Sequence, residues 1–411
     1  MKYFKNTELA KLYKISEKSV RNWIDAARQG KLDLELIEQD DKAHIANTSK
    51  NTFLIEMLVE NGKKYKNGRG FKYIKPTTTF YQLYDAKQVL DIISNIDIHR
   101  EIPYQYTYFD GGAKHWDLYT QRLLQENSSN YLKDIVELVD SNIRSFERII
   151  PKDAKINIID LGVGNCLPVR NLLQYFVDKN RLKRYIGIDI SKDMLNIAER
   201  NVNEWFGEKL KFEGYVRDIN YDRFNDLLSI DSFDTTQGPT VNLVIFFGGT
   251  IANLRDPEYV LRVINDSMGK GDLLIFCLKL DSEKSRRYFD FTTISGGPAN
   301  IFRGKDLLDI LNIDESAYDV EQFFDKTACM RKTQVKLKIA LSLEFQVNNR
   351  SKTIELNKGD TLLLWRARHQ SVVDTINQFD KSDFELLQTS RSTDEEHLLT
   401  VSRIKTSSIE E

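Results

Sequence analysis

The sequence predicts an α/β fold: a mostly parallel sheet with helices on both faces, an inserted α+β lobe, and a small N-terminal helix-turn-helix domain. Between residues 155 and 280, short apolar runs alternate with helical segments, which is the pattern of strands joined by crossover helices. The first run, Ile156–Leu161, leads into a D-x-G-x-G turn, and the second, Tyr185–Asp189, ends in an acid. This layout is typical of a nucleotide-type ligand that lies across the carboxyl ends of neighbouring parallel strands.

Length and composition narrow the class of protein. The 411 residues are enough for two or three domains, and 41% hydrophobic and 29% charged residues are ordinary for a globular protein. A net charge of −2 argues against a polyanion-binding surface over the whole molecule. No apolar run reaches the roughly 18 residues that span a bilayer, and no signal-peptide core is present. Three isolated cysteines offer no CxxC zinc site. We expect a cytoplasmic protein without metal or membrane contact; its oligomeric state is not predicted.

Residues 1–61 predict a helix-turn-helix-like module. Apolar spacing indicates a first helix at Thr7–Tyr13, and Ser16 is a suitable N-cap for a second. Residues 32–47 would add a small wing, so that the segment resembles the winged helix-turn-helix modules of excisionases and related regulators. The second helix would present four polar side chains suited to phosphates and base edges, namely Lys18, Arg21, Asn22 and Arg28.

The charge of this region leaves two interpretations open. Residues 1–75 hold 16 Lys/Arg against 10 Asp/Glu, a local charge of +6, and residues 62–75 read as a basic linker. DNA or RNA is therefore one expected partner. Glu17 and Asp25 on the same helix argue against it, and the alternative is a protein-interaction or dimerisation module with a solvated basic tail.

The predicted core comprises residues 151–281 and 368–405. Its strands are expected at 156–161, 185–189, 210–216, 241–247 and 272–280, followed by a final hairpin of 384–389 and 398–404. Residues 76–150 would form the N-terminal part of a substrate lobe, residues 282–367 the inserted remainder of that lobe, and residues 406–411 a tail. A small substrate is expected in the cleft between lobe and core.

Three patterns describe the lobe. Apolar spacing predicts helices at residues 82–95 and 131–146, with an irregular aromatic stretch at 102–119 between them. That stretch would either cover a core edge or line a site. Val335–Val347 alternates without interruption and predicts one long strand with a single buried face.

The ligand follows from the acids at the strand ends. The turn carries Asp160, Gly162 and Gly164, but Cys166 replaces the third glycine that dinucleotide-binding turns use for close helix packing. Asp189 suits the two hydroxyls of a ribose, and Asp218 with the Ile219 amide suits an adenine edge. Without a diphosphate to hold, this set favours S-adenosylmethionine (SAM).

Three segments carry a resemblance to a known family. They are IIDLGVGNCLPVRNLL from Ile158, YIGIDISKDML from Tyr185, and VIFFGGTIANLRDPEYVLRVINDSMGKGDLLIFCLKLD from Val244. Together they resemble the histidine-specific, SAM-dependent methyltransferases, whose best-known member trimethylates the α-amino group of histidine in ergothioneine synthesis. The family's G-S-T-I-G-N turn reads Gly-Gly-Thr-Ile-Ala-Asn at residues 248–253. The resemblance covers about residues 100–405 and implies a class I methyltransferase core with an inserted substrate lobe.

The resemblance also implies roles for individual residues. The positions that match the family's cofactor contacts are Gly162, Asp189, Asp218, Ile219 and Gly248. Asn253 matches the asparagine that holds the substrate's α-amino group, and Tyr108 matches a tyrosine that lies near both ligands. Tyr131 is the match for a second tyrosine that contacts the substrate. We therefore expect Tyr108 and Asn253 to be the catalytic pair, and the aromatic stretch to be a site wall.

One departure from the family concerns the substrate. The histidine-specific members carry a Glu-x-Ser that reads the imidazole ring, and the corresponding residues here are Trp365 and Ala367. Losing such hydrogen-bonding partners costs orders of magnitude in discrimination. Beside them lie three basic residues, Arg366, Arg368 and His369. Their side chains would bind an anionic substrate or, alternatively, form an exposed basic strand end.

The predicted function is therefore SAM-dependent N-methylation of a small amino-acid-like compound other than histidine. The reaction needs no metal and no nucleophilic side chain. The alternative is a helix-turn-helix regulator with a methyltransferase-like domain that senses SAM or a metabolite. A nucleic-acid methyltransferase is disfavoured, because the chain has no [DNS]-P-P-[YF] motif and no Pro-Cys pair.

Overall fold

The structure is a computed structural model, and contacts divide the chain into two compact units. Unit 1 comprises Met1–Pro76 with Leu337–Asp360, and unit 2 comprises Thr77–Lys336 with Thr361–Glu411. The residues that the structure describes are 3–30, 32–39, 42–64, 70–109, 111–128, 130–229, 238–287 and 304–406.

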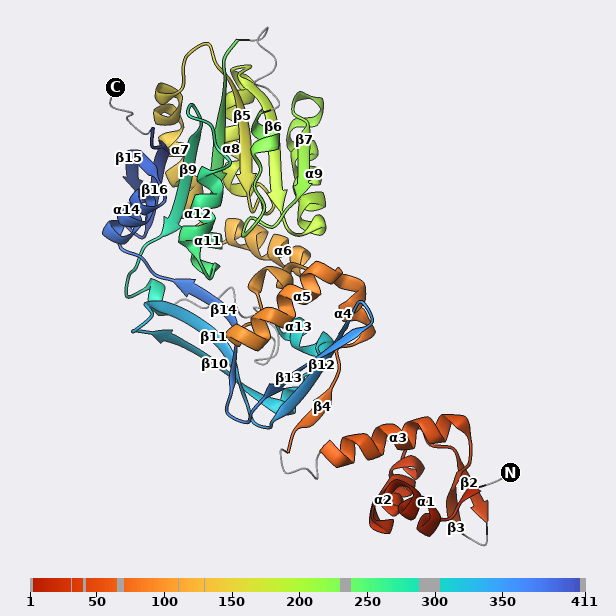
Figure 1. Ribbon diagram of the computed structural model, residues 1–411. Coiled ribbons are helices and arrows are strands. Elements are labelled where there is room, and N and C mark those ends of the chain that lie inside the picture. Colours follow the sequence, from red (N-terminus) through yellow and green to blue (C-terminus); the bar gives the residue numbers. More distant parts are fainter. Residues whose placement is uncertain are drawn as a thin grey trace. The chain divides into compact units, whose positions relative to one another are not determined.

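A seven-stranded sheet forms the centre of unit 2, in the order β15-β16-β9-β8-β5-β6-β7 (Figure 1). Its strands are β5 (Lys155–Leu161), β6 (Leu182–Asp189), β7 (Phe212–Val216), β8 (Thr240–Phe246), β9 (Leu273–Lys279), β15 (Phe384–Arg391) and β16 (His397–Ile404). Strands β5 to β9 are parallel, and β16 runs antiparallel to both β9 and β15. The predicted parallel sheet and its final hairpin are thus confirmed.

The strand order reverses at β5. This strand pairs with β6 on one side and with β8 on the other, and Asp160 lies opposite Gly187 and Ile245 in the two ladders. Because all three strands run in the same direction, their carboxyl ends meet at one edge of the sheet. Such a switch point is where open α/β sheets bind ligands.

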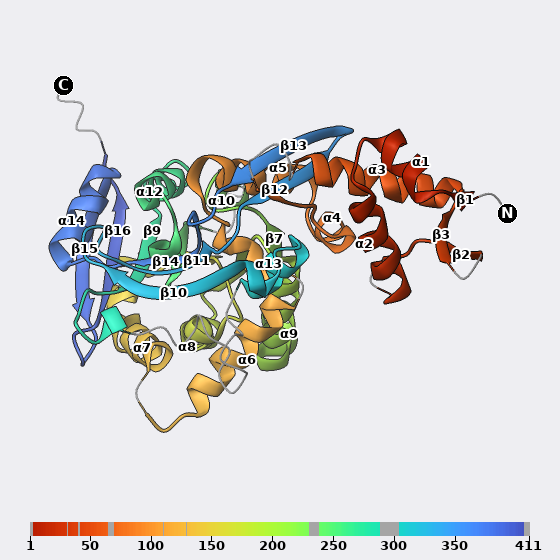
Figure 2. The ribbon, with the colours of Figure 1, turned by 90° about the horizontal axis from the view of Figure 1, so that it is seen from below.

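Helices cover both faces of the sheet (Figure 2). One face is covered by α7 (Tyr131–Ile149), α8 (Arg170–Asp178) and α9 (Lys192–Phe206), and the other by α10 (Asn225–Ser229), α12 (Pro257–Asn265) and α14 (Val372–Lys381). Ile156 and Ile158 of β5 pack into the first apolar layer, whereas Ile159 and Leu161 pack into the second. Each such fully buried side chain contributes roughly 1.5–3 kcal/mol, so the strands are held from both sides.

The remaining elements of unit 2 lie beside the carboxyl edge of the sheet. They are α4 (Thr78–Leu83), α5 (Ala86–Ser94), a π-helical turn (Asn95–His99), a 3-10 helix (Tyr104–Tyr108), α6 (Gly112–Gln125), α11 (Thr250–Asn253), α13 (Lys305–Ile310) and the sheet β10 (Tyr318–Asp325)–β11 (Met330–Leu337)–β14 (Thr361–Arg368).

Two predicted boundaries in this part of the chain are wrong. The helix expected at residues 82–95 is two helices, because Asp85 caps α5 through a reciprocal capping box with Gln88. The stretch 102–119 is not irregular throughout, since α6 begins within it. Its aromatic side chains follow no clean 3.6-residue period, which hid the helix.

The long strand predicted at Val335–Val347 is also wrong. Residues 338–340 interrupt it, so that β11 pairs with β14 while β12 (Leu341–Val347) pairs with β13 (Arg350–Leu356) and with β4 (Lys72–Ile74). The apolar alternation continues through the break in the same phase, and periodicity alone therefore could not reveal it. The predicted turn at Asn348-Asn349 is confirmed, with both residues at positive φ.

Unit 1 contains the predicted pair of N-terminal helices, α1 (Asn6–Tyr13) and α2 (Glu17–Arg28). Ser16 is the N-cap of α2, and its Oγ accepts a hydrogen bond of 3.1 Å from the Ser19 amide. The hairpin of β2 (Leu36–Gln39) and β3 (Lys42–Ala46) occupies the predicted wing, and β1 (Tyr3–Phe4) pairs with β3. A third helix, α3 (Ser49–Lys64), was not predicted from the sequence. That this module is a winged helix-turn-helix stays a prediction.

Both ends of the predicted linker, residues 62–75, belong to regular elements. Helix α3 reaches Lys64, and β4 forms a parallel pair with β12. The predicted inserted lobe is shared between the units, because residues 337–360 group with unit 1. In the described part of the chain, no helix is long and apolar enough to cross a bilayer.

Candidate active site

A cavity of about 220 Å³ opens at the carboxyl edge of the sheet in unit 2. Eleven of the twelve residues predicted to bind the cofactor or the substrate line it, namely Tyr108, Tyr131, Asp160, Gly162, Gly164, Asp189, Asp218, Ile219, Gly248, Asn253 and Ala367. The structure therefore brings together residues that are up to 259 positions apart in the chain. Trp365 is the exception.

The glycine turn after β5 needs its glycines. Gly162 and Gly164 have φ of +65° and +54°, a conformation that side chains with a Cβ rarely adopt. A Cβ on Gly162 would lie 3.6 Å from Thr250 Oγ1, and one on Gly164 would lie 3.5 Å from Trp116 Nε1, which are ordinary contact distances. The backbone conformation, and not a lack of space, therefore requires glycine at both positions. Cys166, which stands at the third glycine position, also has a positive φ of +64° and is fully buried.

Asp160 lies at the end of β5 in a buried position. Burial raises the pKa of its carboxyl to about 8, although the Tyr185 hydroxyl donates a hydrogen bond of 3.0 Å to Asp160 Oδ2. The neighbouring Asp189 adds to the rise in pKa. A cationic ligand group near Asp160 would counter that rise, because an opposite charge favours the carboxylate form.

Asp189 ends β6 and is tied to the aromatic stretch through one serine. Burial raises the pKa of Asp189 to about 6, while backbone amides lower it, and the Ser191 amide donates to Asp189 Oδ1 at 2.9 Å. The Ser191 hydroxyl caps α9 by accepting from the Met194 amide, and it donates to the Tyr108 carbonyl at 3.3 Å. The predicted cofactor acid and the predicted catalytic tyrosine are thus fixed relative to each other.

Asp218 follows β7 and completes the row of acids. Burial raises its pKa, and the amide and side chain of Asn220 counter this by donating hydrogen bonds of 2.9 and 2.7 Å to Oδ1. Ile219 packs against the second apolar layer and also lines the cavity. Among the described lining residues, Asp160, Asp189 and Asp218 are the only carboxylates.

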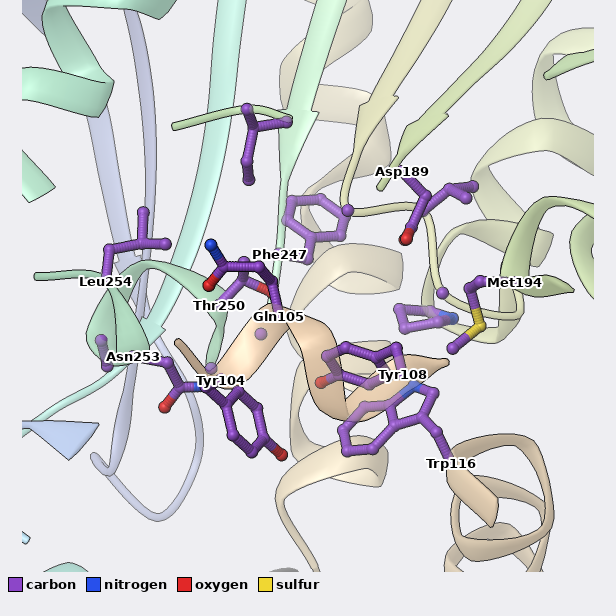
Figure 3. Close-up of a pocket in the computed structure, with 18 of the residues that line it drawn as sticks. Tyr104, Gln105, Tyr108, Trp116, Asp189, Met194, Phe247, Thr250, Asn253 and Leu254 are labelled. Atoms are coloured by element: carbon purple, nitrogen blue, oxygen red, sulfur yellow. The ribbon is translucent and has the colours of Figure 1, made fainter. Parts of the chain in front are cut away.

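Aromatic rings form the side of the cavity opposite Asp189 (Figure 3). Tyr108 makes edge-to-face contacts with Tyr104 at 5.6 Å and with Trp116 at 6.3 Å between ring centroids. These rings come from the 3-10 helix and from α6. Of the two interpretations of the aromatic stretch, the structure supports the site wall.

A polar network fastens α6 to the glycine turn. Asn165 Nδ2 donates to Asp117 Oδ1 at 2.8 Å and to Thr120 Oγ1 at 2.6 Å, and all three side chains are buried. Arg200 of α9 donates to Asp117 Oδ2 at 3.0 Å, and Asn201 donates to the Asn165 carbonyl. The network therefore links α6, which carries Trp116, to the glycine turn.

The turn after β8 supplies the predicted substrate-binding asparagine. Gly248 has a φ of +84°, and Asn253 is the last residue of the short helix α11. Tyr131 stands at the start of α7, after the N-cap Asn130, with its ring stacked on Tyr119. Both Asn253 and Tyr131 line the cavity from the side of β8 and α7.

Trp365 and Ala367 differ in their positions. Ala367 lines the cavity, whereas Trp365 is only 2% exposed and lies behind the wall in a cluster with Tyr104. The guanidinium of Arg331 lies 5.3 Å from the centre of the Trp365 ring. Arg366 does not reach the cavity and instead forms a buried ion pair with Glu101.

Three basic side chains at the β9 side of the cavity, those of Lys279, Arg331 and His397, were not predicted from the sequence. Lys279 ends β9, His397 lies opposite it in the ladder at the start of β16, and Arg331 lies opposite Ala367 in the β11–β14 ladder. Together with Arg368 and His369 they line this part of the cavity. No local motif signals these residues, because four different strands or strand ends supply them.

Asp134 and Asp394 also place a carboxylate oxygen near the His397 ring, with the three ligand atoms within 4.8 Å of one another. That the protein needs no metal stays a prediction.

The four residues predicted to contact nucleic acid belong to α2 in unit 1. Lys18, Arg21, Asn22 and Arg28 are all exposed. Two of the cations face carboxylates of the same module: Arg21 lies 3.6 Å from Glu17, and Arg28 lies 3.0 Å from Glu38. These pairs reduce the positive charge that the helix presents to solvent.

Comparison with known proteins assigns the family. A sequence profile described as "Histidine-specific methyltransferase, SAM-dependent" matches residues 85–404, more than three quarters of the chain. The chain belongs to this family. It is accordingly a SAM-dependent methyltransferase, and the predicted class I methyltransferase fold is confirmed together with the predicted cofactor. The regulator alternative receives no support.

The other comparisons add little. The chain is similar to a SAM-dependent methyltransferase from Clostridium acetobutylicum ATCC 824, at 12% identity and a TM-score of 0.39, over 71% of this chain and 99% of the other. It is also similar to magnesium protoporphyrin IX methyltransferase from Synechocystis PCC 6803 with bound S-adenosylhomocysteine (SAH). That match has 10% identity and a TM-score of 0.38 and covers 74% of this chain and 98% of the other. With TM-scores below 0.5, these likenesses carry no argument. The comparison with curated protein sequences found no significant relative.

The cavity of this methyltransferase fits SAM chemically. Asp189 and Asp218 can accept hydrogen bonds from ribose hydroxyls and from an adenine amine, and the row of three acids favours a cationic ligand. The aromatic faces of Tyr108 and Trp116 suit a sulfonium, which a π face attracts as it attracts other cations.

Proposed function

We propose that this methyltransferase transfers a methyl group from SAM to the amino nitrogen of a small amino-acid-like substrate other than histidine. The observation that carries the proposal is the composition of the cavity wall. Asn253 and Tyr108 share one cavity with the three acids, while the place that would read an imidazole presents the Ala367 methyl group.

The amine end of the substrate is assigned to Asn253 and Tyr108. An amide oxygen and a phenol oxygen can each accept a hydrogen bond from an amine N–H. Asn253 is set by the turn after β8 and Tyr108 by the Ser191 link to β6, so both groups are held on elements that also border the cofactor acids. Their role is to align the nitrogen lone pair with the methyl group.

The side chains on the β14 side of the cavity disfavour histidine as the substrate. Reading a neutral imidazole requires an acceptor for its ring N–H, and the three described lining carboxylates all lie at the ends of β5, β6 and β7. On the β14 side, Ala367 is apolar and Arg331 is a donor only. An imidazole N–H buried there without an acceptor would cost about 1–3 kcal/mol, roughly a 5- to 150-fold loss in discrimination.

When bound, SAM supplies an activated methyl group, so the protein's contribution is alignment and desolvation. The aromatic wall excludes water from the reacting centre, which strengthens the directional contacts made there. The amine must be neutral when it attacks. Hydrogen bonds from its N–H groups to Asn253 and Tyr108 leave the lone pair free for the methyl group.

Substitution of Asn253 tests the proposal. We expect Asn253→Ala to lower kcat/KM for amine methylation by at least about 100-fold, because the amine loses its main acceptor, with the dissociation constant of SAH unchanged. Turnover is measured with methyl-labelled SAM and a pool of amino compounds, and SAH binding by calorimetry. Asn220→Ala, on the adenine side, is the matched control and should weaken SAH binding instead. Retained turnover in Asn253→Ala would contradict the assignment.

A further inference from the structure

The basic side chains on the β9 side of the cavity form a defined group, which we call the basic wall: Lys279, Arg331, Arg368, His369 and His397. They lie across the cavity from the acids. Along the sheet edge the acids end β5 and β6 or follow β7, whereas Lys279 ends β9 and His397 begins the neighbouring β16. The cavity is therefore acidic where the cofactor is expected and basic beyond the methyl acceptor.

Arg331 is held in a fixed orientation within this wall. Its Nε donates a hydrogen bond of 2.9 Å to Nε2 of His369, and its guanidinium lies 5.3 Å from the centre of the Trp365 ring. Nδ1 of His369 in turn lies 3.3 Å from Asp281 Oδ1 and 3.2 Å from Ser285 Oγ. Because Nε2 must accept, the proton of the neutral ring is on Nδ1. This chain of contacts orients the guanidinium, a planar cation of the kind that binds carboxylates and phosphates.

Ala367 gives a ligand access to that guanidinium. Arg331 and Ala367 are directly opposed in the β11–β14 ladder, so their side chains share one face of the sheet. A larger side chain at position 367 would stand between the cavity and Arg331. Trp365 and Ala367, which replace the family's imidazole-binding pair, therefore act on the same group. The Trp365 ring packs against the Arg331 guanidinium, and the small Ala367 side chain leaves that guanidinium accessible from the cavity.

His397 supplies an independent sign of a ligand. It is 1% exposed, and neither ring nitrogen has a hydrogen-bond partner among the described residues. Its ring lines the cavity beside Lys279, whose Nζ lies 3.4 Å from Glu396 Oε2. Buried polar side chains are normally satisfied, and an anionic oxygen in the cavity would satisfy this one. Burial and the neighbouring Lys279 lower the pKa of His397 to about 4, so its ring is neutral near pH 7 and has one N–H to donate to such an oxygen.

We propose that the methyl acceptor is an acidic amine, an amino compound whose end remote from the reacting nitrogen carries a carboxylate or phosphate group held by Arg331 and Lys279. This inference rests on the proposed function and specifies its substrate class. SAM then binds on the acidic side of the cavity, and the anionic end of the substrate binds against the basic wall.

Matched substrate pairs test the proposal on the unmodified protein. We expect kcat/KM to be about 10–100-fold higher for glutamate than for glutamine, or for O-phosphoserine than for serine, since a charge-assisted hydrogen bond is lost in the neutral compound. The first pair reports a carboxylate and the second a phosphate. Equal rates within both pairs would overturn the proposal and leave the proposed function standing, whereas no methylation of any amine would overturn the proposed function itself.

Variants then locate the contact. Arg331→Gln should remove the preference for the acidic member of the pair, and Arg331→Glu should favour a cationic amine such as lysine over glutamate. Lys279→Gln should reduce the preference in the same way, and it keeps the test informative if the Arg331 variants do not fold. Arg403→Gln removes an exposed cation from β16, outside the cavity, and should change nothing. A loss of SAH affinity in folded Arg331→Gln would assign the anion to the cofactor's own carboxylate and overturn the proposal.

Discussion

At the scale of single residues, burial explains which site residues could be assigned from the sequence and which could not. Asp160 and Asp189 were predicted from the ends of apolar runs, because a carboxylate at the end of a buried parallel strand has few roles other than ligand contact. Trp365 was expected in the substrate pocket and lies behind it. Sequence position could not decide between these locations, because Ala367, two residues on, is on the same strand face and does reach the cavity.

Asp160 should make the stability of the ligand-free protein depend on pH. Its pKa is raised from 3.8 to about 8 by burial, so between about pH 4 and pH 8 the folded state binds more protons than the unfolded state. The free energy of unfolding therefore falls as pH rises through this interval and levels off above it. We expect Asp160→Asn to be more stable than the wild type at pH 8.5 by about 1–3 kcal/mol, with a smaller difference at pH 5.

Denaturant unfolding at the two pH values measures this effect. Asparagine keeps an oxygen that accepts the Tyr185 hydroxyl, so the substitution changes charge and little else. Asp153→Asn, at an exposed position, is the control and should show no such pH-dependent gain. A difference between Asp160→Asn and wild type that did not grow with pH would contradict a buried, protonated Asp160.

At the scale of elements, periodicity predicted the strands of the core but not the helices of the aromatic wall, whose role as a site wall followed only from the family resemblance. Continuous apolar runs identify strands buried on both faces, whereas α6 and the 3-10 helix have aromatic side chains with no simple period. Their positions depend on tertiary contacts, chiefly Ser191 to the Tyr108 carbonyl and Asn165 to Asp117. Neither contact is visible in local sequence.

Gly112 fixes the junction between these two elements. A Cβ at this position would lie 1.9 Å from the Thr107 carbonyl oxygen, so the segment that carries Tyr108 would have to shift. We expect Gly112→Ala to destabilise the fold by about 1–3 kcal/mol and to weaken SAH binding. Gly271→Ala, where a Cβ has open space, is the control. Thermal melting and calorimetry with SAH measure both effects, and unchanged SAH affinity would show that the wall is not coupled to the cofactor site.

Helix α2 makes a separate prediction for unit 1. If its outward face contacts nucleic acid, the ion pairs Glu17–Arg21 and Glu38–Arg28 should limit the affinity. We expect Glu17→Gln with Glu38→Gln to tighten binding to duplex DNA, and Arg21→Ala to weaken it, both more strongly at low salt. Fluorescence anisotropy with a labelled duplex measures this. No binding to DNA or RNA at low salt by any variant would favour the alternative, a protein-interaction module.

At the scale of the whole molecule, the central feature is a cavity with opposite charges at its two sides. The acidic side follows from three strand ends that are close in sequence, which is why the cofactor could be predicted. The basic side is assembled from residues 279, 331, 368–369 and 397, and it required the three-dimensional arrangement of β9, β11, β14 and β16. From the sequence, an anionic substrate was one of two interpretations of residues 366, 368 and 369; the structure adds Lys279, Arg331 and His397 to the same wall.

The most direct test of this account is a methyl-transfer assay with the unmodified protein, methyl-labelled SAM and single amino compounds. The predicted result is label on the amino nitrogen of an acidic amine, with a neutral isostere and histidine methylated at least about 10-fold less efficiently. A protein that bound SAH but preferred histidine would contradict the account, because the basic wall would then not be reading the substrate.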